Sequence, residues 1–182
     1  DGPGEVVGFG LSNDERVGST ASFAPAFRIA RRAGLVGVPH GGELLGPSSV
    51  REVVSALAPA RLGHGVRTSE DPALLRAVID EGIALEVCPT SNVHLGVYTD
   101  FSQVPLPTLL SAGARIALAA DDPLLFRSRL VAQYEVARDV FGLSDEALAG
   151  LARSSIDASL ASPSRKAVWK ADIDAWLEAP AA

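Results

Sequence analysis

The sequence has one cysteine, no long hydrophobic run and no excess of basic residues, and each absence excludes a class of protein. Because Cys88 is the only cysteine, the chain cannot build an internal disulfide framework, and we expect a reducing, cytoplasmic setting. No apolar run approaches the roughly 18–20 residues needed to cross a bilayer, so we expect no membrane partner. The net charge of -6, from 22 acidic and 16 basic residues, argues against binding to a nucleic-acid backbone.

Short apolar runs alternate with amphipathic patterns along most of the chain. We expect five strands, at residues 5–9, 35–39, 61–65, 84–88 and 115–120. Three of these runs are nearly continuous in Val, Ile, Leu and Ala, which is typical of strands buried on both faces of a parallel sheet. Helices are expected between the strands, over residues 22–34, 46–59, 70–82 and 105–113, and only helical patterns follow residue 120.

Capping residues predict the ends of two of these helices. Ser22 is a candidate N-cap for the first helix, and Gly34 is a candidate stop, since glycine readily adopts the left-handed conformation that ends many helices. Asp71 is the expected N-cap of the third helix, with Pro72 at its first position, where no N–H is needed.

The repeated strand–helix alternation indicates a parallel α/β architecture, either a doubly wound sheet or a (β/α)8 barrel. No G-x-G-x-x-G or Walker motif opens a helix, so the sequence lacks the motif that is most typical of nucleotide-binding doubly wound folds. A complete barrel typically needs about 250 residues. We therefore expect either an open sheet or the larger part of a barrel whose first strands lie outside this chain.

Polar side chains able to do chemistry follow three of the expected strands. His40 and Glu43 come after the second strand, His64 ends the third, and Asp121 and Asp122 follow the fifth. Taken singly, each has an ordinary explanation, as a loop histidine, a solvated acid or the N-cap of a helix. Jointly they predict one site, because barrel enzymes assemble their active sites at the carboxyl ends of the strands.

The residue types fit a catalytic zinc ion. Zinc takes roughly three nitrogen, oxygen or sulfur ligands from the protein and keeps a position for water. His40 and Asp121 are suitable ligands, and a single cysteine excludes a thiolate site. Two ligands would not normally hold zinc, so we expect the others to come from a partner, either a missing N-terminal half or a second copy.

Four motifs, in this order and spacing, resemble those of the adenosine deaminase family: PHGGE at 39–43, RLGHG at 61–65, LEVCPTSN at 85–92 and ADDPLLF at 120–126. The resemblance covers nearly the whole chain. It implies a (β/α)8 TIM barrel of the metal-dependent hydrolase type, here incomplete, with residues 1–182 as the C-terminal part of a single deaminase domain, covering roughly strands four to eight.

The resemblance also implies a role for each polar residue. His40 would bind Zn²⁺, and Asp121 would bind it too and contact the attacking water. Glu43 would donate a proton to purine N1, and His64 would orient the water that zinc activates. Asp122 would bind purine N7. The implied reaction is hydrolytic deamination of adenosine or 2'-deoxyadenosine to inosine or 2'-deoxyinosine plus ammonia, which requires Glu43 to carry a proton near neutral pH.

Three departures from the family pattern bear on the metal and the substrate. The H-x-H pair that supplies two zinc ligands in the family is absent, so we expect the chain alone to be inactive. The usual HAGE reads HGGE, which keeps the working side chains. The usual DLAGDE reads GLSNDE, so Asn13 replaces the loop glycine whose N–H meets purine N3, and Gly10 replaces an acidic residue. We expect Asn13 and Gly42 to contact the substrate.

These departures leave alternatives open. The substrate can instead be adenine or a modified adenine nucleoside such as aminodeoxyfutalosine. A second alternative is a catalytically inactive, deaminase-like binding protein, against which the retained polar residues argue.

Overall fold

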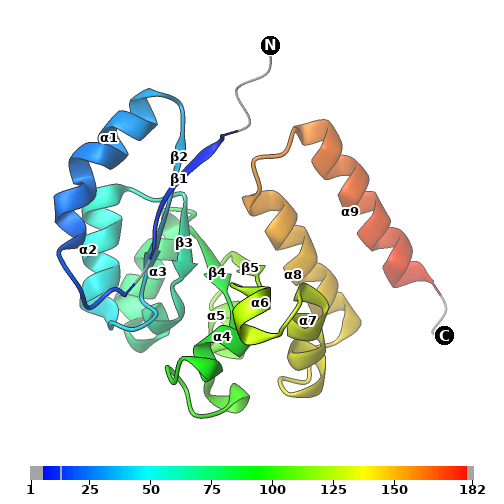
Figure 1. Ribbon diagram of the computed structural model, residues 1–182. Helices are drawn as coiled ribbons and strands as arrows, with labels where there is room; N and C mark the ends of the chain where they lie inside the picture. Colours follow the sequence, from blue (N-terminus) through cyan, green and yellow to red (C-terminus); the bar gives the residue numbers. More distant parts are fainter. Residues whose placement is uncertain (1–5, 13, 180–182) are drawn as a thin grey trace. The chain divides into compact units, whose positions relative to one another are not determined.

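The computed structural model describes residues 6–12 and 14–179 of the chain. The chain forms two compact units (Figure 1). Unit 1 comprises residues 1–87 and 105–115, and unit 2 comprises residues 88–104 and 116–182. Across the described ranges, no helix is both long and apolar enough to cross a membrane.

Four strands of unit 1 pair in chain order, and every pair is parallel. They are β1 (Gly8–Leu11), β2 (Val36–Gly41), β3 (Arg61–His64) and β4 (Ala84–Val87). The parallel α/β expectation is therefore confirmed. β1 begins later than predicted and reaches Leu11, because its extent follows its partner: Gly8 pairs with Val36, and Leu11 pairs with Pro39.

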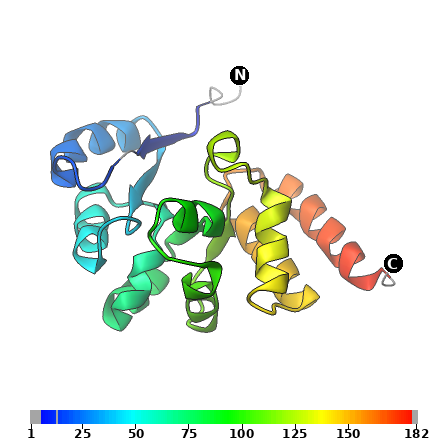
Figure 2. The ribbon, with the colours of Figure 1, turned by 60° about the horizontal axis from the view of Figure 1, so that its bottom comes forward.

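Helices connect these strands, as parallel pairing requires. They are η1 (Thr20–Phe23), α1 (Ala24–Arg32), α2 (Pro47–Leu57), η2 (Val66–Glu70) and α3 (Pro72–Asp80). Unit 1 also contains α5 (Leu106–Ser111), which follows β4 in the chain. Figures 1 and 2 show α1 and α2 side by side on one face of β2. Phe27 of α1 packs edge-on against Phe9 with ring centroids 4.9 Å apart. Val50, Val53 and Leu57 form the buried face of α2.

Two of the three predictions of helix ends are confirmed, and one is wrong. Asp71 caps α3 as expected, since its carboxylate accepts hydrogen bonds from Ala73 N and Leu74 N, both at 3.0 Å. Gly34 follows α1 with a φ of +83°, which confirms the predicted stop. Ser22 is not the N-cap of α1: a 3-10 turn precedes the helix, and the Ser22 hydroxyl donates to Ser19 O at 2.6 Å.

The described part of unit 2 contains one strand and otherwise mostly helices. Its elements are α4 (Pro89–His94), η3 (Phe101–Gln103), β5 (Ile116–Leu118), α6 (Pro123–Phe126), α7 (Leu130–Asp139), α8 (Asp145–Ala158) and α9 (Pro163–Glu178). α8 packs against β5 and α9, and α8 and α9 lie side by side in both ribbon views. All five expected strands are present among the described residues, in the strand–helix order of part of a (β/α)8 barrel.

Candidate active site

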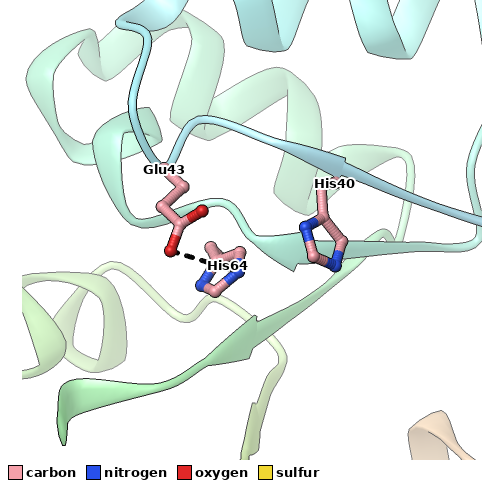
Figure 3. Close-up of side chains that lie close together, drawn as sticks. All are labelled: His40, Glu43 and His64. Atoms are coloured by element: carbon pink, nitrogen blue, oxygen red, sulfur yellow. Dashed lines mark ion pairs between the residues drawn. The ribbon is translucent and has the colours of Figure 1, made fainter. Parts of the chain in front are cut away.

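The register of β2 and β3 brings two histidines together. In β2, a Cβ on Gly37 or Gly41 would meet side chains of α1 and α2, so these positions face the helices. Successive side chains of a strand point to opposite faces, and His40 therefore points away from the helices. His40 pairs with Gly63, one residue before His64. The two imidazole rings lie 4.9 Å apart at an angle of 87° (Figure 3).

Gly63 leaves the space that the His40 ring occupies. A Cβ at this position would lie 2.3 Å from His40 Cδ2 and 2.9 Å from Nε2. Contacts this short do not occur in folded proteins, so only glycine is compatible with the observed orientation of His40. A residue without a side chain thus determines where the first candidate ligand points.

Glu43 is placed beside His64 by the loop that follows β2. Glu43 is 5% exposed and His64 is 2% exposed. Glu43 Oε1 lies 3.4 Å from His64 Nε2 (Figure 3). The contact needs a proton on one of the two groups, because a carboxylate and an unprotonated Nε2 are both acceptors. Two groups that can exchange a proton therefore meet in a place from which bulk water is largely excluded.

Backbone strain coincides with two of the predicted site residues. His64 has a φ of +62° and Asp121 a φ of +57°, in the left-handed region that favours glycine. For a non-glycine residue this conformation costs about 1–3 kcal/mol, and such strain clusters at active sites. The other described non-glycine residues with a positive φ, Ala58 and Arg127, are C-caps of helices, whereas His64 and Asp121 end no helix.

Three side chains of unit 1 together offer a donor set for a metal ion. His40, Glu43 and His64 each have a ligand atom within 4.8 Å of the others'. Imidazole nitrogen and carboxylate oxygen are ligands that zinc accepts. His40 is the most accessible of the three, which fits its predicted role as a metal ligand better than a role in the buried Glu43–His64 contact.

Asp121 and Asp122 belong to unit 2 and lie a few residues after the end of β5. Asp121 Oδ2 accepts a hydrogen bond of 2.6 Å from the hydroxyl of Ser91, whose side chain is fully buried. Asp122 is the N-cap of α6 and accepts from the backbone N–H groups of Leu124 and Leu125. The N-cap interpretation is thus confirmed for Asp122, and the joining of both aspartates with the unit 1 residues stays a prediction.

Besides Asp122, two further residues were predicted to contact the substrate, Asn13 and Gly42. Asn13 lies outside the described residues. Gly42 has a φ of +76°, and a Cβ there would lie 2.4 Å from Val50 Cγ2. Gly42 is therefore required by the loop itself, whether or not it touches a substrate.

A cavity of about 290 Å³ lies beside His40. It is lined by Leu11, Ser12, Asp14, Glu15, Val17, Ser19, Thr20, Phe23 and His40. Hydrogen bonds from Arg16 lower the pKa of Asp14 to about 2, so its carboxylate stays ionised at neutral pH. The volume is at the lower end of the range for small-molecule sites.

The sequence reasoning missed two polar residues, one in each unit, that contact predicted site residues. Ser91 lies within the LEVCPTSN motif, but nothing local to the sequence pairs it with Asp121, which is thirty positions away. Glu15 lies within the GLSNDE segment and contacts the loop that carries Glu43. The LEVCPTSN motif contained the only signal for Ser91, and the GLSNDE segment, a departure from the family pattern, contained the only signal for Glu15.

Comparisons with known proteins identify the family of this chain. A family model described as adenosine deaminase matches residues 2–176. A Streptomyces virginiae protein whose name joins adenosine and adenine deaminase is 56% identical over 172 residues, covering 94% of this chain and 51% of the relative.

Solved structures give the same result. The crystal structure of adenine deaminase from Arthrobacter aurescens superposes with a TM-score of 0.91 at 32% identity, over 95% of this chain and 53% of that one. An amidohydrolase from Burkhoderia ambifaria with bound Zn gives a TM-score of 0.87 at 26% identity, over 96% of this chain and 49% of that one. The chain therefore spans about half the length of the proteins that it matches. With the motifs, the site and the family match in agreement, this chain belongs to the adenosine deaminase family.

Proposed function

We propose that the protein carrying this chain is a zinc-dependent hydrolase that deaminates an adenine base or adenine nucleoside. The observation that carries the proposal is the buried Glu43–His64 contact beside His40, at the carboxyl ends of β2 and β3. A protonated carboxyl group, an imidazole and a metal ligand at one sheet edge are the parts that hydrolysis of an amidine C–N bond requires.

The metal would be held by His40 and Asp121 together with ligands from outside this chain. When bound, zinc lowers the pKa of a coordinated water to near 7 and so supplies a nucleophile at neutral pH. The family's H-x-H pair would provide the remaining ligands, with residues 1–182 forming the C-terminal part of a single deaminase domain. The amidohydrolase with bound Zn supports this choice of metal.

The residues of this chain divide the proton transfers between them. His64 orients the attacking water and accepts one of its protons as the water oxygen bonds to C6 of the purine ring. Electron density then moves onto N1, and Glu43 donates its proton there, which relieves the charge in a site with little water to do so. The proton that His64 accepted passes to the C6 amino group, the C6–N bond breaks and ammonia leaves. The proton on the new C6 oxygen returns to Glu43, and a 6-oxopurine with a proton on N1 remains. Asp122 would hold the substrate through N7.

Among substrates, we favour adenine over adenosine and 2'-deoxyadenosine. The names of the relatives support adenine, alone in one case and together with adenosine in another. The GLSNDE segment, which differs from the usual adenosine deaminase sequence near N3 and the ribose, points the same way.

Ammonia release by the full-length, zinc-loaded protein tests the proposal. Adenine, adenosine and 2'-deoxyadenosine are offered separately, and the Glu43→Gln variant serves as the matched control because it keeps the size of the side chain. We expect ammonia from at least one substrate and a loss of about 10²–10⁴-fold in kcat for Glu43→Gln. Stoichiometric zinc without ammonia from any of them would refute the activity, and tight adenine binding without turnover would identify the inactive alternative.

A further inference from the structure

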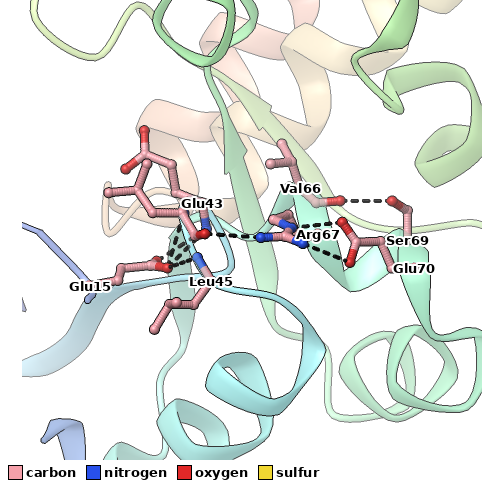
Figure 4. A network of polar contacts seen from close by, with 8 residues as sticks. Glu15, Glu43, Leu45, Val66, Arg67, Ser69 and Glu70 are labelled. Atoms are coloured by element: carbon pink, nitrogen blue, oxygen red, sulfur yellow. Dashed lines mark hydrogen bonds and ion pairs between the residues drawn. The ribbon is translucent and has the colours of Figure 1, made fainter. Parts of the chain in front are cut away.

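Glu15 holds the loop that carries the proposed proton donor. This loop, residues 42–46, joins β2 to α2, and Glu43 is its second residue. The Glu15 carboxylate accepts hydrogen bonds from Glu43 N at 3.1 Å, Leu44 N at 3.1 Å and Leu45 N at 2.9 Å (Figure 4). Three consecutive backbone N–H groups thus converge on one side chain that lies 28 to 30 positions earlier in the sequence.

This arrangement suits a carboxylate in particular. Successive N–H groups that point to one side form an anion-binding concavity, and hydrogen bonds to an ionised acceptor are stronger than neutral ones. Both oxygens of a carboxylate accept hydrogen bonds. A glutamine side chain has an NH2 group in place of one of these oxygens, and this donor would face a backbone N–H, which is also a donor. The structure therefore uses the negative charge of Glu15, as well as its length, to fix the loop.

The loop is also held from its carbonyl side. Arg67 Nη1 donates to Leu44 O at 2.9 Å, and Arg67 Nε donates to Glu70 Oε1 at 2.7 Å, as Figure 4 shows. Gly42 fits against Val50 without space for a Cβ. With both the N–H groups and a carbonyl bound, the backbone around Glu43 has little freedom to move.

We propose that Glu15 is a positioning residue for the deamination: by binding the backbone of residues 43–45, it sets the direction in which the Glu43 carboxyl group meets the substrate. The role of Glu15 in turnover rests on the proposed function. Its hold on the loop does not, because the hydrogen bonds exist whatever the substrate is.

The kinetic test compares Glu15→Ala and Glu15→Gln with Asp71→Ala in the full-length protein. Asp71 is the matched control, since its carboxylate also accepts backbone N–H groups in unit 1 but caps α3 and does not contact the loop. We expect kcat to fall about 100-fold for Glu15→Ala, as for a misplacement of about 1 Å, with a much smaller change in KM, since Glu15 also lines the cavity beside His40. Asp71→Ala should leave kcat unchanged.

A double-mutant cycle separates positioning from a general loss of structure. If Glu15 acts through Glu43, Glu15→Ala should change kcat by no more than about twofold in a Glu43→Gln background, because the donor that it positions is already lost. An equal 100-fold loss in both backgrounds would overturn the proposal in favour of a purely structural role.

Backbone amide hydrogen exchange gives a readout that needs no activity. The amides of residues 43–45 should exchange faster in Glu15→Ala and Glu15→Gln than in the wild-type protein, and at the wild-type rate in Asp71→Ala. Unchanged exchange would overturn the proposal, and so would faster exchange with an unchanged kcat in an active enzyme. If the wild-type protein released no ammonia, the proposed function would fail, while exchange would still decide whether Glu15 holds the loop.

Discussion

Replacing Gly63 by alanine should displace His40 without unfolding the protein. The new Cβ would approach His40 Cδ2 to 2.3 Å, where an ordinary contact begins near 3.4 Å. The ring must therefore retreat by about 1 Å, a displacement that can cost about 100-fold in rate. Gly63 lies in β3 without a positive φ, so the alanine backbone itself is unstrained. We expect an overpacking cost of about 1–3 kcal/mol in the free energy of unfolding.

The assay measures zinc affinity, by competition with a chelator, and kcat/KM in the full-length protein. We expect zinc affinity to fall about 10–100-fold, as for changes that misorient a metal ligand. Gly37→Ala is the control: Gly37 is a buried strand glycine of the same unit, but its Cβ would make an ordinary 3.4 Å contact with Phe27. If Gly63→Ala folded and kept wild-type zinc affinity and kcat/KM, the argument that His40 is a ligand oriented by this space would be wrong.

Two further predictions concern other parts of the site. Ser91→Ala removes the hydroxyl that donates to Asp121, so zinc affinity should fall about 10-fold with an unchanged thermal midpoint; an unchanged affinity would mean that Asp121 is oriented without Ser91. Asp14→Asn removes the ion pair with Arg16. The pKa of Asp14 is lowered to about 2 in the folded protein. The ion pair therefore stabilises the folded state at pH values above the pKa of an unfolded aspartate, and this stabilisation is lost as the pH falls through about 2. Thermal unfolding should thus show a small, salt-sensitive difference from wild type at pH 7 that shrinks toward pH 2, whereas a difference that grew as the pH fell would contradict this sign.

Local patterns in the sequence were enough to predict the order of the five strands and of the longer helices, but not the short helix α4 (Pro89–His94), for which no helix was expected. Apolar runs and helical periodicity located every strand to within a few residues, and Asp71 and Gly34 marked helix ends correctly. Such signals are local because hydrogen bonding to the nearest backbone groups and the burial of one face depend on a few neighbouring residues. Ser22 failed as a cap because the chain forms a 3-10 turn there, which the residue type alone does not reveal.

The sequence also predicted which residues take part in the chemistry of the site, but not how they are arranged in space. The strand-end positions of His40, Glu43 and His64 indicated a shared site, and the structure brings these three together. The need for glycine at position 63 follows from the pairing of β2 with β3, since a shift of one residue would turn His40 to the other face. Glu15 is separated from its loop by 28 or more positions, so only the folded chain decides that they meet.

The sequence by itself determined the elements of this protein and the residues able to do its chemistry, because both depend on residue type and short spacing. Only the tertiary structure decided which of those residues face one another, which glycine makes room for a ligand and which carboxylate holds the donor loop. These depend on strand register and on packing between distant segments, where a few ångströms separate a working arrangement from none.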